Sequence, residues 1–447
     1  MTQKVTSLTQ TYGGYFNTYV PPEDAELTHV GPGTPCGEYL RRYWQPVAHT
    51  GDLGERPLAI RILGEDLVVF RDGSGRIGLL HAHCAHRGAS LEYGVIQEHG
   101  IRCCYHGWHF DVDGRILEMP TSHREGPYRG RLCQGAYPIR EFHGLVFAYL
   151  GPPDLIPPFP LFDTFASDDF VLCLGDPVGL SNLKPCNWLQ VMDNVVDPAH
   201  EVFLHTRYSG HRFIDYNGRE VMETGDMGVI AFEPTPIGLV AQETRRVGED
   251  VWVRGIECIA PNIAQIAQVP ILPPQYRDEA MRLCMVPRVT RWRVPVDDHN
   301  TREFAIVRRR PDEPNRYAEK PSGVLKANYG GRSYEEMQSN PGDYEVQISQ
   351  RPIARHELEN LTETDKGIIL FRQMIRDGIA AVRAGRDPLG AMRPGDAPIP
   401  TYGSDTVLRV PRAQTPEEDR ELLIKTARRV HEEALAVQPI KSANIMV

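Results

Sequence analysis

Two short cysteine and histidine motifs constrain this chain more than any other feature of its sequence. The first is Cys84-x-His86 and the second is Cys103-x-x-His106. Nine cysteines in 447 residues are too few for a disulfide scaffold. Clustered motifs of this kind therefore indicate a metal centre, held by two loops that the surrounding chain must bring together.

The ligand set suits a binuclear iron–sulfur cluster, in which two thiolates hold one iron and two neutral imidazoles hold the other. Gly88 and Gly107 flank the two loops, where a backbone that wraps closely around a cluster needs glycine. A Cys2His2 zinc site is the alternative, but zinc motifs usually pair like ligands, as Cys-x2-4-Cys and His-x3-5-His. Cys104 could replace its neighbour as a thiolate, although the spacing to His106 favours Cys103.

A second candidate metal motif runs Asp197-x-x-His200 and then, after four residues, His205. Two imidazoles and a carboxylate leave open positions on Fe(II), as oxygen activation beside a bound substrate requires. A zinc hydrolase motif would need its second histidine at i+4, whereas the spacing here is i+5. Asp197 and Pro198 would also suit the start of a helix, and both interpretations can hold at once.

The two sets of motifs resemble the oxygenase (alpha) component of the Rieske non-haem iron aromatic-ring-hydroxylating oxygenases. Gly107, Trp108 and Phe110 follow the second cluster motif as they do in that family, although Cys104 stands where the family has proline. Asn187-Trp188 and Asn194, before the histidine motif, are also similar to the family. The resemblance follows the chain in order, from the cluster motifs to the iron motif.

This resemblance implies one [2Fe–2S] Rieske cluster and one mononuclear non-haem Fe(II). The implied cluster ligands are Cys84, His86, Cys103 and His106. The implied iron ligands are His200, His205 and a later carboxylate on a long helix, for which Asp365 aligns best and Glu363 and Asp377 are rivals.

The strand and helix patterns predict an α+β fold. Short alternating apolar runs between Trp44 and Leu150 indicate an all-β module, and the proline-rich residues 151–160 indicate a connector. With the resemblance, we expect an all-β Rieske domain followed by a helix-grip (START-like) catalytic domain with an antiparallel sheet and long C-terminal helices. The expected division is an N-terminal segment 1–40 packing on the catalytic domain, a Rieske domain 41–155 and a catalytic domain 156–447.

The family also implies how electrons reach the iron. In it, Asp197 would not bind iron but would bridge a cluster histidine, His106, of one subunit to His200 of the next, so that a homotrimer, or a dimer of trimers, is implied. No Gly-x-Gly-x-x-Gly follows a strand, so we expect a separate NAD(P)H-dependent reductase, with or without a ferredoxin. A Rieske-type electron carrier is the alternative function, which the chain length and the second motif oppose.

The expected reaction uses O2 to hydroxylate or O-demethylate an aromatic substrate. Four stretches resemble the phthalate dioxygenase-like branch, which includes aryl-ether O-demethylases: PIGLVAQETRR, VWVRGIECIAPN, WRVPVDDHNT and TETDKGIILFRQ. Many members of that branch take aromatic acids, and a buried carboxylate would need a bidentate arginine. The candidates are Arg207, Arg245, Arg246 and Arg254.

Composition excludes several other classes of protein. The net charge is −10 and no basic run forms the stripe of a nucleic-acid binder. The first twenty residues lack the pattern of a signal peptide, and no apolar run is long enough for a membrane span. We therefore expect a cytoplasmic protein.

Overall fold

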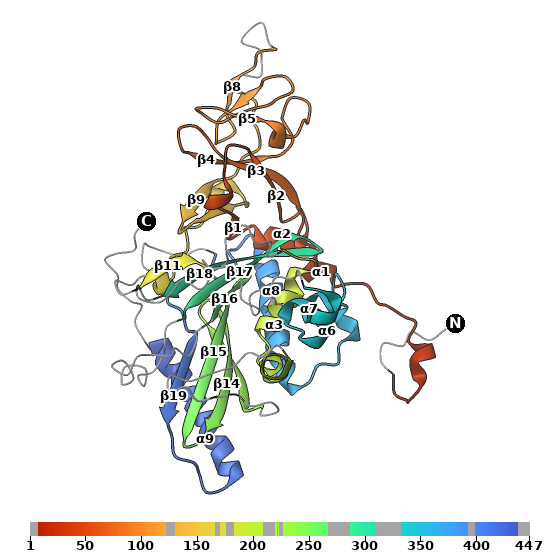
Figure 1. Ribbon diagram of the computed structural model, residues 1–447, viewed down its shortest axis with the longest axis vertical. Helices are drawn as coiled ribbons and strands as arrows, with labels where there is room; N and C mark the ends of the chain where they lie inside the picture. Colours follow the sequence, from red (N-terminus) through yellow and green to blue (C-terminus); the bar gives the residue numbers. More distant parts are fainter. Residues whose placement is uncertain are drawn as a thin grey trace.

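A β-rich module stands on a larger body of sheet and helices in the computed structural model (Figure 1). The structure describes residues 8–121, 130–165, 170–175, 183–208, 220, 222, 227–266, 287–309, 311, 332–391 and 398–436. No helix in these ranges is both long and apolar enough to cross a membrane.

The upper module consists of short antiparallel strands in three sheets, ordered β1-β10-β9, β2-β3-β4 and β5-β6-β7-β8. Its strands are β1 (Trp44–His49), β2 (Leu58–Ile62), β3 (Glu65–Arg71), β4 (Ile77–His81), β5 (Val95–Ile96), β6 (Ile101–Arg102), β7 (His109–Phe110), β8 (Ile116–Glu118), β9 (Ile139–Phe142) and β10 (Leu145–Tyr149). Leu63 and Gly64 form the tight turn between β2 and β3, and both have positive φ. That turn type fits the right-handed twist of a hairpin.

The larger body is built on one antiparallel sheet, with nine strands among the described residues. Along the sheet the order is β11-β18-β17-β16-β15-β14-β13, while β12 also pairs with β18 and β19 with β15. The strands are β11 (Val171–Leu174), β12 (Leu183–Lys184), β13 (Val229–Thr235), β14 (Gly238–Val247), β15 (Asp250–Ile259), β16 (Ile263–Ile266), β17 (Val289–Asp297), β18 (Asn300–Arg309) and β19 (Ser404–Arg409). Side chains alternate between the two faces, so register decides which residues meet.

Helices cover this sheet from both sides (Figure 1). The α-helices are α1 (Ala25–Thr28), α2 (Pro35–Leu40), α3 (Trp188–Val195), α6 (Tyr334–Ser339), α7 (Asp343–Ser349), α8 (Lys366–Arg383) and α9 (Pro416–Ala436). The 3-10 turns are η1 (Gly13–Phe16), η2 (Thr50–Asp52), η3 (Leu91–Tyr93), η4 (Pro153–Leu155), η5 (Asp163–Phe165), η8 (His356–Leu358) and η9 (Glu363–Asp365), and η6 (Glu201–Tyr208) is π-helical. The α3 helix contacts β17 and β18, and α9 contacts β13, β14 and β15. The α+β fold with its antiparallel sheet and long C-terminal helices is confirmed.

The N-terminal segment divides into two parts. The α1 and α2 helices contact α8, where Tyr39 lies so close to Gly378 that a side chain there would collide with its ring. Residues 8–20 extend away from the body, and almost all of them are exposed (Figure 1). The division of the chain into segments 1–40, 41–155 and 156–447 stays a prediction.

Candidate metal centres

The two Cys/His loops have the same backbone geometry. In the first loop, Cys84 N donates to Ala89 O at 2.9 Å and Gly88 N donates to Cys84 O at 2.8 Å. In the second, Cys103 N donates to Trp108 O at 2.8 Å and Gly107 N donates to Cys103 O at 3.0 Å. Gly88 and Gly107 have φ values of 75° and 74°, which glycine adopts without a steric cost. The repeated turn explains why each loop carries a glycine after its histidine.

These loops bring together the four predicted cluster ligands. Cys84 and Cys103 are both 3% exposed, and the Cys84 thiol hydrogen-bonds the Cys103 thiol. The rings of His86 and His106 lie 4.5 Å apart between centroids. Burial, and then the neighbouring thiol, raises the pKa of Cys84 to about 11, so metal binding there must displace a proton.

The spacing of the ligands fits a cluster better than a single ion. His86 Nδ1 is buried and has no hydrogen-bond partner, as expected of an atom reserved for a metal. The four Cys and His side chains do not all lie within the 4.8 Å of one another that a single ion would require. A binuclear cluster instead divides its ligands between two irons. Cys104 is exposed whereas Cys103 is buried, which favours Cys103 as the thiolate of the second loop.

Gln134 supports the first loop, a role that the sequence around it does not indicate. Its Oε1 accepts from Ala85 N at 2.7 Å, and its Nε2 donates to the carbonyl oxygens of His81 at 2.8 Å and His83 at 2.9 Å. The side chain is 3% exposed. Gln134 therefore ties the backbone on both sides of Cys84 to the rest of the module.

The second site is formed by His200, His205 and Asp343. Within the described ranges, they are the only group of three or more potential ligands whose atoms all lie within 4.8 Å of one another. Nε2 of His200 lies 3.6 Å and Nε2 of His205 lies 3.4 Å from Asp343 Oδ1. That oxygen is buried and accepts no hydrogen bond. A cation between the two rings and the carboxylate would satisfy it.

The local backbone explains the i+5 spacing of the histidines. The η6 segment is a π-helix, in which hydrogen bonds run from i to i+5, so residues five apart approach the same face. Nδ1 of His200 hydrogen-bonds the carbonyl oxygen of Asp197, which fixes the ring and directs Nε2 towards Asp343. The i+5 spacing, which does not fit the zinc hydrolase motif, therefore fits the π-helical backbone of η6.

Asp365 is not one of the three clustered residues, and its role as the iron carboxylate stays a prediction. Its Oδ2 accepts from Thr362 N at 2.6 Å and from Thr362 Oγ1 at 2.9 Å, which makes it part of the capping box of η9, the turn that precedes α8. Neither rival replaces it, because Glu363 is exposed and Asp377 accepts from Gln373 on the surface of α8. The geometry points to Asp343 on α7 as the carboxylate of the site.

Asp197 lies beside the histidines without being one of the three clustered residues. Its Oδ2 is 3.8 Å from His200 Nδ1, and its Oδ1 accepts from Ala199 N at 2.8 Å. Burial raises the pKa of Asp197, and the charge of Asp365 adds to this, whereas His200 acts in the opposite direction. Asp197 therefore lies beside the outer nitrogen of His200, where residues that support a metal-binding imidazole are found.

A chain of buried side chains orients Asp343 from behind. Asn194 hydrogen-bonds the Asp343 side chain, and Asn194 Oδ1 accepts from Gln347 Nε2 at 2.8 Å. Gln347 Oε1 in turn accepts from Lys184 Nζ at 2.7 Å, and Lys184 lies 3.4 Å from Glu303 on β18. Burial opposes the charge of Asp343, but His205, His200 and Lys184 together lower its pKa. The carboxylate is therefore held ionised.

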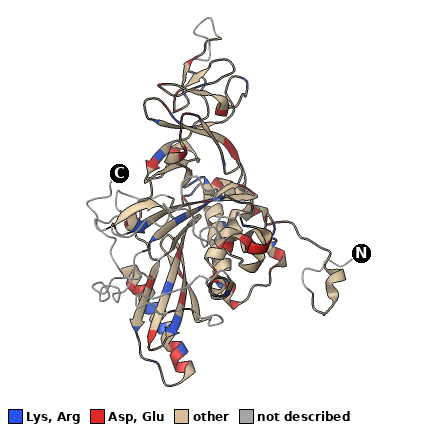
Figure 2. Ribbon diagram, viewed as in Figure 1, with Lys and Arg blue, Asp and Glu red and all other residues tan. Residues whose placement is uncertain are grey.

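The four arginines proposed for substrate binding have other contacts. Arg207 is exposed, with its guanidinium 5.5 Å from the ring centre of Tyr208. The other three make buried ion pairs. Arg245 pairs with Glu243, and Arg246 pairs with Asp419. Arg254 pairs with both Glu201 and Asp405. Figure 2 shows basic residues along the strands of the large sheet, where these pairs form. Ion pairs within the fold therefore engage three of the four arginines, and a role for any of the four in substrate binding stays a prediction.

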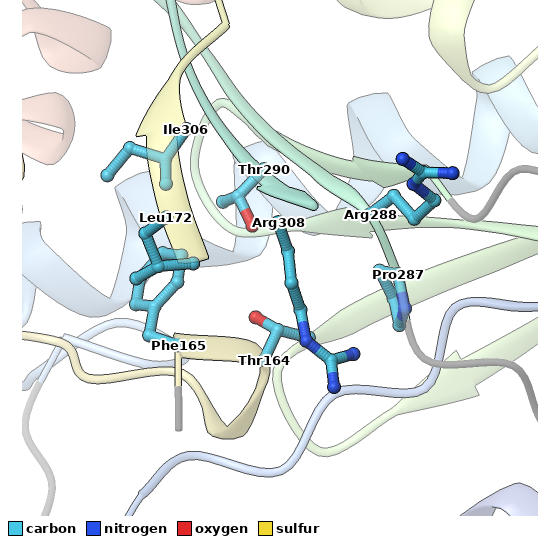
Figure 3. Close-up of a pocket in the computed structure, with 8 residues that line it drawn as sticks. All are labelled: Thr164, Phe165, Leu172, Pro287, Arg288, Thr290, Ile306 and Arg308. Atoms are coloured by element: carbon cyan, nitrogen blue, oxygen red, sulfur yellow. The ribbon is translucent and has the colours of Figure 1, made fainter. Parts of the chain in front are cut away.

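A small, shallow hollow lies elsewhere on the sheet (Figure 3). Thr290, Ile306 and Arg308 line it from β17 and β18, and Thr164 and Phe165 line it from η5. It contains none of the clustered ligands, and we assign no function to it.

Comparison with known proteins identifies the family. The Rieske [2Fe-2S] domain family matches residues 43–143. The chain is 42% identical to the tert-butanol monooxygenase / tert-amyl alcohol desaturase oxygenase subunit of Aquincola tertiaricarbonis, over 92% of this chain and 88% of the relative. The chain belongs to the Rieske non-haem iron oxygenases. Its identity to the phenoxybenzoate dioxygenase alpha subunit of Ectopseudomonas oleovorans is 38%, over 82% of this chain and 87% of that one.

The fold of this Rieske oxygenase also matches solved structures. The NdmA of Pseudomonas putida CBB5 with caffeine superimposes with a TM-score of 0.58 at 20% identity, over 78% of this chain and 94% of that one. The family membership confirms that the chain is an oxygenase component of a multicomponent system rather than an electron carrier. It also confirms the Rieske [2Fe–2S] domain.

Proposed function

We propose that His200, His205 and Asp343 hold one mononuclear Fe(II), and that Cys84, His86, Cys103 and His106 hold the Rieske cluster. The observation that carries the iron proposal is the unpartnered, buried Oδ1 of Asp343 facing two imidazole nitrogens. Two imidazoles and one carboxylate are the ligand set of non-haem Fe(II) oxygenases. Bound iron supplies the activation of O2 beside the substrate.

The surrounding residues then have separate tasks. Asp197 fixes the ring of His200 through its carbonyl oxygen, and Asn194 fixes the carboxylate of Asp343. Such supporting contacts hold metal ligands in one orientation and raise the basicity of the imidazoles. With iron bound, these ligands would hold the place where O2 and a substrate carbon are brought together.

Electrons are proposed to cross between subunits of a homotrimer, which could also stack as a dimer of trimers. The Asp197 carboxylate of one copy would bridge His200 to His106 of a neighbouring copy. Apolar side chains are exposed at both ends of such a contact, at Tyr93 and Tyr105 beside the cluster loops and at Phe203 beside the iron. A separate NAD(P)H-dependent reductase, with or without a ferredoxin, would supply the electrons, and a cytoplasmic location is part of this proposal.

The proposed substrate is an aromatic compound that is hydroxylated or O-demethylated. The phenoxybenzoate dioxygenase relative, named for an aromatic substrate, supports this class. Because Arg245, Arg246 and Arg254 are ion-paired within the fold, a substrate carboxylate would need other polar groups. We therefore place no requirement for a carboxylate on the substrate.

A tertiary alcohol is the second candidate substrate. The relative with 42% identity is named for tert-butanol and tert-amyl alcohol, so a branched aliphatic carbon is a reasonable alternative target. Hydroxylation of a methyl group is the same step in either substrate class, since the metal centres do the chemistry and the pocket determines which carbon approaches.

The test combines metal analysis with a substrate panel. Anaerobically purified protein loaded with Fe(II) is expected to hold the two irons and two sulfides of the cluster plus one further iron, with a Rieske EPR signal on reduction. With a surrogate reductase, formaldehyde release from methoxyaromatics or hydroxylation of aromatic acids supports the first substrate class, and oxidation of tert-butanol supports the second. A colourless zinc protein contradicts both metal assignments.

A further inference from the structure

Arg254 on β15 lies between two carboxylates from distant parts of the chain. Its Nε is 3.1 Å from Glu201 Oε2, and its Nη1 donates to Asp405 Oδ2 at 3.1 Å. Glu201 directly follows His200 and is the first residue of η6, which carries His205. One guanidinium therefore joins the iron-bearing segment to the C-terminal strand of the sheet.

The sheet register fixes the outer half of this contact. Arg254 and Asp405 are directly opposed on β15 and β19. Trp252, on the same face of β15, donates its Nε1 to Asp405 Oδ1. Because both carboxylate oxygens have donors, Asp405 is held rigidly, and it holds one end of the Arg254 fork.

All three charged side chains are buried, so each needs its partner in place. Arg254 is 9% exposed, Glu201 5% and Asp405 0%. Removing one member of a buried ion group leaves the others uncompensated, which costs more than the group contributes when complete. Such a group gives the segment one preferred position.

We propose that Arg254 is a positioning residue that anchors η6, and with it the two iron histidines, to the sheet through Glu201 and Asp405. The inference rests on the proposed iron site. Arg254 was expected to bind substrate, but its guanidinium contacts Glu201 and Asp405 instead. It also gives the late strand β19 a part in holding His200 and His205, which come far earlier in the chain.

The chain offers a matched control in Arg246. Arg246 Nη2 is 2.6 Å from Asp419 Oδ1, and this pair is also largely buried, but it joins β14 to α9. Glu243, the cross-strand neighbour of Arg254, is three positions from Arg246, so the two arginines lie on opposite faces of the sheet. Arg246→Met removes a buried arginine–aspartate pair without touching η6.

The test compares Fe(II) affinity and the EPR spectrum of the Fe(II)–nitric oxide adduct in the full-length protein. Arg254→Met is expected to weaken Fe(II) binding at the mononuclear site about 10- to 100-fold, the range found for supporting residues of metal ligands. Its nitrosyl signal should broaden into several species, while the Rieske EPR signal stays unchanged. Arg246→Met should keep the wild-type affinity and nitrosyl spectrum, even where it lowers the melting temperature.

Two further variants test the proposal if Arg254→Met does not fold. Arg254→Lys keeps the charge without the fork and should give an intermediate Fe(II) affinity. Glu201→Gln with Arg254→Met removes both inner partners and should fold better than Arg254→Met alone. Equal Fe(II) affinity and equal nitrosyl spectra for the Arg254 variants and Arg246→Met overturn the positioning role while leaving the iron site intact. A wild-type protein that binds no mononuclear iron overturns the iron proposal and this one together.

Discussion

Oδ1 of Asp343 lies 3.4 Å from Nε2 of His205, with no hydrogen-bond donor on that oxygen. This relationship distinguishes Asp343 from Asp365, whose carboxylate already accepts two hydrogen bonds from Thr362. The contrast between the two aspartates is the most direct way to test the proposed iron ligands.

Asp343→Asn is expected to remove the mononuclear iron while the cluster remains. The amide is neutral and a poor ligand for Fe(II), so affinity should fall at least about tenfold and oxygenation should stop. Iron per chain, acid-labile sulfide and product formation measure the three effects. Asp365→Asn is the matched control and should keep its iron. Iron loss from Asp365→Asn but not from Asp343→Asn would restore the ligand set expected from the sequence.

Gln347→Leu should destabilise the fold around the iron carboxylate. The substitution leaves Asn194 Oδ1 and Lys184 Nζ without their buried partner, and an unsatisfied buried polar group costs about 1–3 kcal/mol. Urea unfolding of the apo protein measures this cost, and Fe(II) titration measures its effect on Asp343. Gln338→Leu on α6 is the control, because Gln338 makes an exposed contact with Tyr334. Equal unfolding free energies for the two variants would show that the buried chain adds nothing.

The sequence predicted the parts of the site whose members are close together in the chain. Cys103 and His106 share one turn, and His200 and His205 share one helical segment, so their spacing reports their geometry. Asp343 could not be found this way. It lies at the start of a helix, as acidic residues commonly do because of the helix dipole, and Asp365 also lies at a helix start.

The same limit applies to the arginines. Their residue type suggested a carboxylate clamp, but pairing across the sheet decides what they bind. The register of β15 with β19 places Asp405 opposite Arg254, and no local pattern in either strand announces that pairing. The strands and the order of the two modules were predictable from alternation and turns, whereas buried ion pairs depend on which strands become neighbours.

Glu257 predicts a pH dependence of stability. Burial raises its pKa from the ordinary 4.5 to about 8, and the hydrogen bonds from Tyr402 N and Thr235 Oγ1 only partly oppose this. Between about pH 5 and 8 the folded protein therefore binds a proton that the unfolded chain has lost, so this group's stabilising contribution falls as pH rises through that window. Glu257→Gln should flatten the slope, by an amount on the order of a few kcal/mol across the window.

Chemical denaturation at several pH values measures that slope for the wild type and the variant. Asp154→Asn is a suitable control, because Asp154 is an exposed acid in η4 and should leave the slope unchanged. A wild-type slope that persists in Glu257→Gln would assign the pH dependence to other buried acids, of which Asp405, with its pKa raised by burial to about 7, is the next candidate.

Gln134→Leu should loosen the cluster without removing a ligand. Leucine has a similar size but cannot accept from Ala85 N or donate to the carbonyl oxygens of His81 and His83, so the backbone around Cys84 loses three hydrogen bonds. Each buried group left unsatisfied costs about 1–3 kcal/mol, and the loop that holds one thiolate and one imidazole becomes easier to open. The expected result is faster bleaching of the visible Rieske spectrum on mild heating or chelation, with the as-purified EPR signal still present.

The control for Gln134→Leu is Gln97→Leu in the same module. The Gln97 side chain donates to Ile96 O at 3.1 Å and accepts from Arg102 Nε at 3.5 Å, so it makes none of the three hydrogen bonds that hold the Cys84 loop. Its bleaching rate should match the wild type. If both variants bleach alike, the cluster is held by its ligands alone, and the hydrogen bonds of Gln134 serve the β-sheet rather than the metal centre.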